Sequence, residues 1–399
     1  MKKSRVLFVI PSLFQGGTNR VLEDLTTLID KSKYDSFVMP LRKGMGINSY
    51  YGRQFSKGSH LFFLPELLGW MTFGRIPFAL HNRIYKCLGF DTIRQWLFKK
   101  LAKNIEKRIQ PDVVVAFEEG LPVAVCHFFK CKKIAWIHCD YQQGYAKNMD
   151  SSQLKIEEKK FSLYHKIVCV SYYTANTFTS IFKRLKDKTI VIHNPVGVER
   201  ILKMADEKTG DERFVKEGFI IISVGRFAKV KQFDLIPDII RNVERINNQQ
   251  FKYRWYIIGD GEKKLIDETM QKIDNYGLGE KLVLLGAKDN PYPFLKAADL
   301  YVCTSSTEAY PCVINEAKVL QVPIVSNMFP SVCEIMTSDD GVVSEFSTLP
   351  SAVMEIMANI SKEKPKTRSR MASENDIIMK EIEKLFKIEI EEKLKTVEC

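Results

Sequence analysis

ADLYVCTSSTEAYPCVINEAKVLQVPIV, residues 298–325, runs from a short apolar segment through a polar loop into a helical pattern. The apolar segment Leu300–Val302 predicts a strand, and the spacing of apolar residues over Val313–Leu320 predicts a helix. Glu308 falls in the loop and Glu316 in the helix, with seven residues between them. Strand, loop and helix in this order form the repeating unit of a parallel α/β sheet.

Ligands of parallel α/β sheets bind outside the carboxyl ends of the strands, where the loop between a strand and its helix lies. Two carboxylates at this place can accept hydrogen bonds from sugar hydroxyls. A solvated helix face supplies glutamate pairs at similar spacing, so the pair by itself leaves both interpretations open. The rest of the chain has to distinguish them.

The chain is long enough for two domains of about 200 residues each. Its 399 residues are 45% hydrophobic and 27% charged, which is typical of a globular protein. Short apolar runs alternate with helical patterns, and this alternation predicts parallel sheets covered on both faces. The strands we expect are 6–10, 37–41, 113–117, 134–137, 167–170, 190–192, 219–224, 253–258, 282–285, 300–302 and 323–326.

The alternation breaks at His193–Val196, and the charged stretch Glu199–Asp211 is typical of a linker. We therefore predict an N-terminal domain over residues 1–200, a C-terminal domain over 201–375, and a last helix over 376–399 that packs back on the first domain. The predicted fold class is α/β, with two Rossmann-like doubly wound domains facing a central cleft.

The positive charge of the chain is concentrated in its first half. Residues 1–200 carry 32 basic and 16 acidic side chains, a surplus of +16, whereas the whole chain carries +12 and the remainder therefore −4. The stretch Ile84–Ile109 combines helical apolar spacing with many Lys and Arg, and Leu61–Leu80 is apolar. Together they predict contact with an anionic membrane surface, while packing on the core and a merely soluble basic surface remain alternatives. We predict no nucleic-acid partner.

Neither a disulfide framework nor a membrane span is expected. The nine cysteines are odd in number and have no paired spacing, which fits a reducing cytoplasm and implies no zinc site. Leu61–Leu80 carries Glu66, Arg75 and two prolines, and these argue against a transmembrane helix.

Glycines follow the first predicted strand. Gly16 and Gly17 precede a predicted helix over Arg20–Ile29, for which Thr18 or Asn19 is the expected N-cap. Glycines at this place let the backbone approach a ligand, and a helix N-terminus offers N–H groups to an anion. A plain tight turn explains the pair equally well.

Other polar residues also follow predicted strands. His138 comes directly after the strand that ends at Ile137, where a side chain faces the ligand crevice, although a structural hydrogen bond in a loop is an alternative. In the second half, Gly225, Arg226 and Lys231 follow the strand over 219–224.

The ordered set of these segments resembles the retaining glycosyltransferases of the group 1 family, which have the GT-B fold. The resemblance covers nearly the whole chain. It is carried by Gly16-Gly17, Trp136-Ile137-His138, His193-Asn194-Pro195-Val196, Val224-Gly225-Arg226-Phe227 with Lys231, Gly259-Asp260-Gly261, Asn290-Pro291-Tyr292, Ala298-Asp299-Leu300, and the pair Glu308 and Glu316.

The resemblance implies a retaining transfer from a nucleotide sugar, with an acceptor-binding first domain and a donor-binding second domain. It places the cations Arg226 and Lys231 at the leaving diphosphate, whose growing charge they stabilise. It also implies that Glu308 and His138 bind the donor sugar and that Glu316 binds the ribose hydroxyls. The remaining donor-binding residues that it implies are Gly16, Gly17, Gly225, Asn290, Ala309, Tyr310 and Pro311.

No metal ligands and no cofactor are predicted, and a uridine diphosphate sugar is favoured over a guanosine diphosphate sugar. One position departs from the family pattern. Many relatives have Gly directly after the first glutamate, whereas this chain has Ala309, whose Cβ changes how closely the loop approaches the sugar.

We therefore predict a metal-independent hexosyl- or N-acetylhexosaminyltransferase that acts on a saccharide acceptor, which we expect to be lipid-linked. Capsule, exopolysaccharide or O-antigen synthesis is the expected context, and the inner face of the cell membrane, with the protein cytoplasmic and peripheral, is the expected location. Two other classes remain open, namely a nucleotide-sugar isomerase or epimerase of similar fold and a non-catalytic protein that binds anionic lipid.

Overall fold

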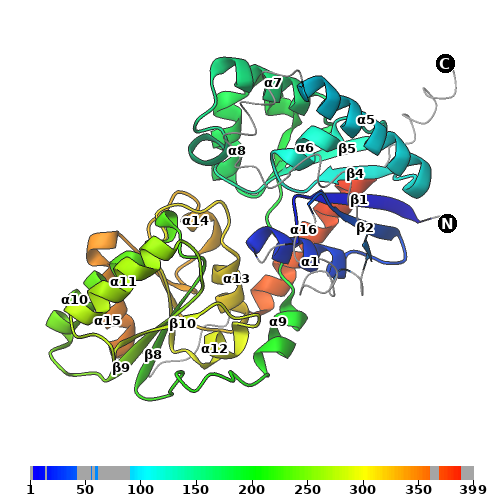
Figure 1. Cartoon of the computed structure of the whole chain (residues 1–399). Helices are drawn as coiled ribbons and strands as arrows, with labels where there is room; N and C mark the ends of the chain where they lie inside the picture. The colour runs from blue at the N-terminus through cyan, green and yellow to red at the C-terminus, as the bar shows by residue number, and fades with distance from the viewer. Residues whose placement is uncertain are drawn as a thin grey trace, which may run out of the picture. The chain divides into compact units, whose positions relative to one another are not determined.

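The computed structural model describes residues 3–13, 16–42, 55, 59–61, 90–359 and 368–387 (Figure 1). The chain forms two compact units: unit 1 comprises Met1–Pro195 with Ile377–Cys399, and unit 2 comprises Val196–Asp376. Of the stretches interpreted above as membrane-facing, residues 62–80 and 84–89 lie outside the described residues.

Unit 1 is built on a seven-stranded sheet in which all neighbouring strands are parallel, in the order β3-β2-β1-β4-β5-β6-β7. Its strands are β1 (Ser4–Ile10), β2 (Tyr34–Pro40), β3 (His60–Leu61), β4 (Val113–Ala116), β5 (Lys132–Ile137), β6 (Lys166–Cys169) and β7 (Thr189–Val191). Its α-helices are α1 (Gly17–Leu28), α5 (Phe90–Ile109), α6 (Leu121–Cys126), α7 (Ser151–Ser162) and α8 (Tyr172–Ile181).

Unit 2 repeats the plan with six parallel strands in the order β10-β9-β8-β11-β12-β13. Its strands are β8 (Phe219–Val224), β9 (Tyr253–Ile258), β10 (Leu282–Gly286), β11 (Leu300–Cys303), β12 (Ile324–Asn327) and β13 (Gly341–Ser344). Its α-helices are α9 (Val198–Ala205), α10 (Ile236–Asn247), α11 (Lys263–Asn275), α12 (Tyr292–Ala297), α13 (Cys312–Val319), α14 (Val332–Ile335) and α15 (Leu349–Asn359), and α16 (Arg368–Phe386) starts in this unit.

Both faces of the unit 2 sheet are covered, as the continuous apolar runs of its strands require. Ile220 and Ile222 of β8 belong to one buried cluster, which includes residues of α9, α12 and α13. Ile221, on the opposite face of the same strand, belongs to a second cluster with residues of α10 and α15. Each unit thus has the strand order and the two covered faces of a Rossmann-like domain, and the predicted fold class is confirmed. The central cleft stays a prediction.

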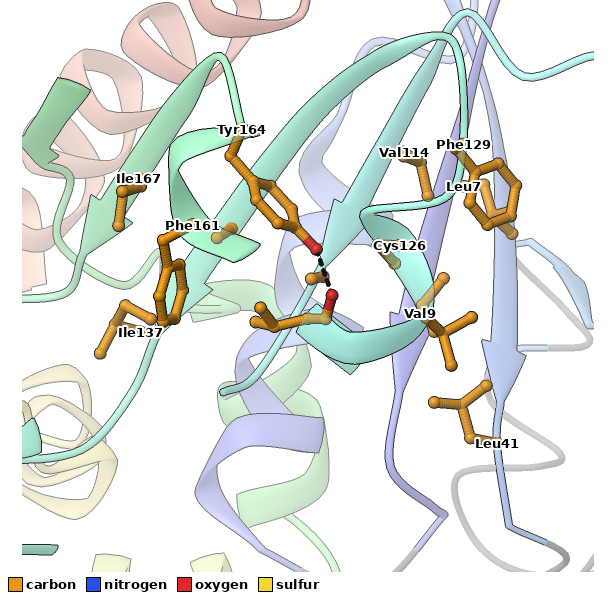
Figure 2. Packing of buried hydrophobic residues seen from close by; sticks show 14 of the residues in the cluster. Leu7, Val9, Leu41, Val114, Cys126, Phe129, Ile137, Phe161, Tyr164 and Ile167 are labelled. Atoms are coloured by element: carbon orange, nitrogen blue, oxygen red, sulfur yellow. Dashed lines mark hydrogen bonds between the residues drawn. The ribbon is translucent and has the colours of Figure 1, made fainter. Parts of the chain in front are cut away.

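The core of unit 1 contains a buried polar group that is satisfied within the cluster. Figure 2 shows Leu7 and Val9 of β1, Val114 of β4 and Tyr164 among the packed residues. The Tyr164 hydroxyl is fully buried and donates to the carbonyl of Val123 on α6 at 2.8 Å. This bond removes the cost of burying an unpaired hydroxyl.

The expected linker over Glu199–Asp211 is wrong in its first half, because Val198–Ala205 forms helix α9. Ile201 and Ala205 are buried in the unit 2 cluster, while Glu199 and Lys203 of the helix are exposed. Alternating charge along an amphipathic helix therefore mimicked a linker. Unit 1 accordingly ends at Pro195 rather than at residue 200.

The last helix, α16, starts earlier than expected and takes part in both units. Near its start, the Asn375 side chain accepts from the backbone amide of Val196 at 2.9 Å and donates to its carbonyl at 2.6 Å. Further along, Glu383 forms an ion pair with Lys33 at 3.0 Å, and Phe386 packs against Phe8 of β1. In the part of the chain that the structure describes, no helix is both long and apolar enough to cross a membrane.

Candidate functional site

Two loops at the carboxyl ends of neighbouring strands of unit 2 are joined by backbone hydrogen bonds. The amide of Gly225, directly after β8, donates to the carbonyl of Ile258 at 3.0 Å. The Phe227 amide donates to the Asp260 carbonyl at 2.9 Å, and the Phe227 carbonyl accepts from the amide of Glu262 at 2.8 Å. The pairing of β8 with β9 therefore continues into the loops that follow these two strands.

This pairing brings the two backbones so close that the second loop needs glycine. A Cβ on Gly259 would lie 1.7 Å from the carbonyl oxygen of Gly225, and one on Gly261 would lie 2.3 Å from that of Phe227. Because these neighbours are backbone atoms, neither can move aside without breaking the pairing. The Gly259-Asp260-Gly261 motif thus has a structural cause, which is the close approach of two strand-end loops.

Lys231 and Glu308, which follow β8 and β11 respectively, form an ion pair. Both side chains are largely enclosed, with exposed fractions of 22% and 14%. Their loops are also joined by backbone contacts, since the Thr304 hydroxyl donates to the Lys231 carbonyl at 2.6 Å and the Ser306 amide donates to the Val230 carbonyl at 2.8 Å. The structure thus brings together two predicted site residues that are 77 positions apart.

The electrostatic surroundings keep Lys231 charged. Burial lowers the pKa of Lys231, but Glu308 and the nearby thiols of Cys303 and Cys312 outweigh it, so the net shift of this pKa is upward. An enclosed ammonium group that stays protonated is a fixed positive charge at the carboxyl ends of the strands.

Arg226, in the same loop as Lys231, is exposed. Among the described residues it makes no ion pair, in contrast to Lys231. Its guanidinium group therefore keeps its full donor capacity for an anion from solution. Gly225, just before it, lies against Phe233 and the aliphatic part of Lys231.

Glu316 lies on α13 and is 7% exposed. One of its carboxylate oxygens, Oε1, accepts a hydrogen bond from the Tyr292 hydroxyl at 2.9 Å. A carboxylate has two oxygens and about four lone-pair sites, so it can accept more than one hydrogen bond.

The loop between Glu308 and Glu316 is held at its start by a hydrogen bond from a residue that lies outside the loop. The Ser331 hydroxyl donates to the backbone carbonyl of Glu308 at 2.7 Å. Ala309 and Tyr310 are partly exposed, and burial raises the pKa of the Tyr310 hydroxyl. Pro311 is the N-cap residue of α13 and has no side-chain cap bond.

Asn290, a predicted donor-binding residue, has a side-chain amide whose three bonds are all to unit 2. Its Oδ1 accepts from the Tyr292 amide at 3.1 Å, and its Nδ2 donates to the Met204 carbonyl at 2.8 Å and to Glu207 at 2.9 Å. These bonds tie the start of α12 to the end of α9.

In unit 1, α1 begins at Gly17, and its N-cap is Gly16. The prediction of Thr18 or Asn19 as N-cap is therefore wrong. Asn19 is used differently, because its side-chain amide donates to the carbonyl of Ser12 and closes the preceding loop at 3.0 Å. Gly16 has an extended backbone, and a Cβ there would meet no atom within 4 Å, so the fold itself does not require glycine at this position.

His138 directly follows β5, and its ring contacts Phe117 at a centroid distance of 4.7 Å. Burial lowers the pKa of His138 to about 3, which keeps the imidazole neutral. Its Nε2 is buried and has no hydrogen-bond partner among the residues that the structure describes. Buried polar atoms are rarely left unsatisfied, so this nitrogen is suited to a ligand hydroxyl.

Two carboxylates outside the predicted site, Glu118 and Glu119, follow β4, and Glu119 contacts His138. Glu119 accepts a hydrogen bond from the backbone amide of His138 at 3.1 Å. Burial raises the pKa of Glu118 to about 7, with a further contribution from Glu119, while Arg42 opposes the shift. Their position directly after β4 was the available signal, because the carboxyl ends of adjacent parallel strands share one edge of the sheet.

Comparison with known proteins links these features to one family. Residues 204–376 match the family described as Glycosyl transferases group 1. This segment contains Arg226, Lys231, Glu308 and Glu316.

Three curated relatives illustrate the similarity. An uncharacterized glycosyltransferase of Methanocaldococcus jannaschii is 26% identical over 63% of this chain, and the match spans only 60% of that protein's length. The amylovoran biosynthesis glycosyltransferase AmsD of Erwinia amylovora is 24% identical over 84% of this chain and 83% of its own length. The Escherichia coli UDP-Gal:alpha-D-GlcNAc-diphosphoundecaprenol alpha-1,3-galactosyltransferase is 27% identical over 42% of this chain and 43% of its own.

Among solved structures, that of HepE from Anabaena in complex with UDP and glucose has a TM-score of 0.67 to this chain. The similarity covers 95% of this chain and 98% of HepE, at 15% sequence identity. It shows that the two proteins share their fold, and it confirms the GT-B fold that the sequence predicts.

Replacing Gly259 by Ala should destabilise unit 2 by at least about 3 kcal/mol, because the new methyl group would collide with the Gly225 carbonyl. Urea unfolding followed by the fluorescence of Trp255, the one tryptophan in the sequence of unit 2, measures the change. Gly279→Ala is the control, since a Cβ there meets no atom within 4 Å. Equal stability of the two variants would contradict the close approach.

Replacing Glu118 by Gln should stabilise the protein more at pH 8 than at pH 5. The folded-state pKa of about 7 exceeds the ordinary value of 4.5, so the contribution of this carboxyl to stability falls as pH rises between these values. Gln does not titrate, and the difference in unfolding free energy between variant and wild type should therefore grow by about 2–3 kcal/mol over this range. Urea unfolding at both pH values tests this, and a difference independent of pH would refute it.

Proposed function

We propose, from the match of residues 204–376 to the glycosyl transferases group 1 family, that the chain transfers a sugar from a nucleotide sugar to a saccharide acceptor with retention of the anomeric configuration. The observation that carries the proposal is the enclosed Lys231–Glu308 ion pair beside the exposed Arg226, all at the carboxyl ends of strands in unit 2.

The chemistry of the transfer explains why cations belong at this place. Cleavage of the bond between the anomeric carbon and the diphosphate builds negative charge on the leaving phosphate. Lys231 supplies a fixed point charge, and Arg226 supplies a planar fork of donors that matches phosphate oxygens. Stabilisation of charge that develops in the transition state accelerates the reaction directly. In this proposal the two side chains supply the neutralising charge without a metal ion.

The carboxylates serve to bind hydroxyl groups. Glu316 accepts from the ribose of the donor, and Glu308, already oriented by Lys231, accepts from the transferred sugar. In unit 1, the buried and neutral Nε2 of His138 provides a partner for a further sugar hydroxyl. Glu308 acts in this proposal as a hydrogen-bond acceptor, and the leaving phosphate oxygen takes the proton of the acceptor hydroxyl.

We propose a uridine diphosphate sugar as donor and a lipid-linked saccharide as acceptor. The solved structure of HepE holds UDP and glucose, and the E. coli relative is named for a UDP-galactose donor and a diphosphoundecaprenol acceptor. AmsD is named for amylovoran biosynthesis, and we propose a surface polysaccharide as the product to which the transfer by this chain contributes. Departure of Ala309 from the family glycine keeps the identity of the transferred sugar a question for experiment.

Release of nucleoside diphosphate tests the proposal. The protein is incubated with each of a panel of uridine and guanosine diphosphate sugars, with and without undecaprenyl- or polyprenyl-diphosphate saccharides. Release that requires the acceptor supports a transferase. Conversion of the donor without any acceptor would instead identify an isomerase, and lack of release across the panel would refute the proposed activity.

Replacing Lys231 by Met should lower kcat/KM of the transfer by about 10²–10³, because the charge on the leaving diphosphate loses its enclosed partner. Lys229→Met is the matched control, since Lys229 is exposed in the same loop and forms no ion pair among the described residues. It should change kcat/KM by less than about threefold. A similar loss in both variants would point to the overall charge of the loop rather than to the Lys231–Glu308 pair.

We also propose that unit 1 docks on the inner face of the membrane through α5. One side of this helix is buried in the core, through Phe98, Leu101, Ala102, Ile105 and Ile109. The other side is exposed and basic, through Lys99, Lys100, Lys103, Lys107 and Arg108. Trp96 is 57% exposed on this helix, with the ammonium of Lys100 5.0 Å from its ring. Basic residues beside an exposed indole suit an anionic lipid surface.

Replacing Lys99 and Lys103 by Glu should weaken sedimentation with vesicles that contain phosphatidylglycerol by at least about tenfold, because each basic residue near such a surface contributes about 1 kcal/mol. Lys263→Glu with Lys264→Glu makes the same charge change on the exposed side of α11 in unit 2 and should leave binding nearly unchanged. Wild-type binding that is insensitive to salt or to lipid charge would contradict the proposed docking.

A further inference from the structure

Three side chains of unit 2 form a line of polar contacts that ends at Glu316. Arg200 on α9 donates through Nη1 to the Tyr292 hydroxyl at 3.0 Å, and the Tyr292 hydroxyl donates to Oε1 of Glu316 at 2.9 Å. The residues come from α9, α12 and α13, which cover one face of the unit 2 sheet (Figure 1). Tyr292 is fully buried, so its hydroxyl is placed between the other two groups rather than in solvent.

The direction of these bonds is fixed by chemistry. Arginine has five N–H donors and no acceptor, so the Tyr292 oxygen must be the acceptor in its bond with Arg200. The single hydroxyl proton of Tyr292 is then directed at Glu316. A tyrosine polarised by a cation on one side donates more strongly to a carboxylate on the other, because such bonds reinforce one another.

Tyr292, the middle residue of this line, is held by several contacts. The Arg200 guanidinium also lies over the Tyr292 ring, 5.4 Å from its centroid. The Asn290 side chain accepts from the Tyr292 amide and donates to the carbonyl of Met204, the residue four positions after Arg200. Tyr292 is therefore held by its ring, its backbone and its hydroxyl, and it has little freedom to follow a movement of Glu316.

We propose that Tyr292 and Arg200 are positioning residues that fix the carboxylate of Glu316 in the orientation that binds the ribose hydroxyls of the donor. This inference rests on the proposed function, and it adds two residues whose effect on the donor acts through Glu316. It gives a reason for the tyrosine in Asn290-Pro291-Tyr292 and for a long cationic side chain on α9.

The alternative is that Tyr292 only fills the core. In that case its hydroxyl contributes to stability, and its removal weakens the binding of every nucleotide equally. A positioning role predicts a selective effect, because only ligands that present ribose hydroxyls benefit from an oriented Glu316. Selectivity for the ribose hydroxyls thus separates the two roles.

The experiment measures Kd by titration calorimetry for uridine diphosphate and for its 2′-deoxy and 3′-deoxy analogues. Wild type should bind uridine diphosphate at least about tenfold more tightly than one of the analogues, as expected for a hydrogen bond to a charged acceptor. Tyr292→Phe should reduce this preference to less than about threefold while the analogue binds nearly as before. Arg200→Met should also reduce the preference for uridine diphosphate over the analogue, because the Tyr292 hydroxyl no longer accepts a hydrogen bond from Arg200 and its proton is less strictly directed.

Tyr256→Phe is the matched control. Tyr256 is also fully buried in unit 2, and its hydroxyl bonds to the backbone of Val215 rather than to a site residue. This variant should lose stability but keep the wild-type preference. Thermal unfolding of all variants identifies any that fail to fold, and Arg200→Met then provides a second test of the same line of contacts.

The outcomes separate the inference from the proposed function. Wild-type discrimination that survives in both Tyr292→Phe and Arg200→Met overturns the positioning role and leaves the proposed function intact. An equal loss for uridine diphosphate and its analogues overturns it as well, in favour of a purely structural role. If wild type binds neither uridine nor guanosine diphosphate, the proposed function fails, and the inference fails with it.

Discussion

The ion pair between Lys231 and Glu308 is the interaction on which the candidate site depends. Burying two charges is expensive, and a buried pair is stable only when its geometry and its further hydrogen bonds compensate for lost solvation. Here the backbone on each side is held as well, by Thr304 at the carbonyl of Lys231 and by Ser331 at the carbonyl of Glu308. The pair therefore joins the loops that follow β8 and β11, which are adjacent strands in the sheet. Under the proposed function, it also keeps a cation charged where the leaving diphosphate needs one.

The glycines beside this pair have different physical causes. Gly259 is imposed by the approach of two backbones, and it serves the shape of the loops rather than contact with a ligand. Gly16 has no such constraint, because its backbone is extended and the space around its Cβ position is open. Contact with a ligand and a plain tight turn both stay predictions for this glycine.

Sequence reasoning succeeded where the signal is local and failed where it depends on distant contacts. The runs Phe219–Val224 and Tyr253–Ile258 are apolar and bounded by polar turns, and the strands have these same limits. The charge pattern of α9 resembles that of a linker, and the burial of Ile201 and Ala205 that stabilises this helix depends in part on α12 and α13, which lie more than 80 residues away in the sequence. The contacts of Tyr292 with Arg200 and Glu316 span 92 and 24 positions, so no local pattern indicates them. Glu118 and Glu119 were not predicted as site residues, since the burial that raises the pKa of Glu118 comes from the folded surroundings.

Three carboxylates of the two units are each held by a contact within the folded protein, without a ligand. Glu308 is bound by Lys231, Glu316 by the hydroxyl of Tyr292, and Glu119 by the backbone amide of His138. Fixing a flexible side chain on binding costs about 0.5–1.5 kcal/mol, and a group already fixed in the folded protein avoids this cost when the ligand binds. The same bonds orient the acceptor lone pairs, so under the proposed function a sugar hydroxyl would meet a defined geometry rather than a mobile charge. Under the proposed function, the polar contacts that stabilise the fold also hold the acceptor groups in place for the donor. These contacts within each unit are therefore as important to the site as the residues that would touch the ligand.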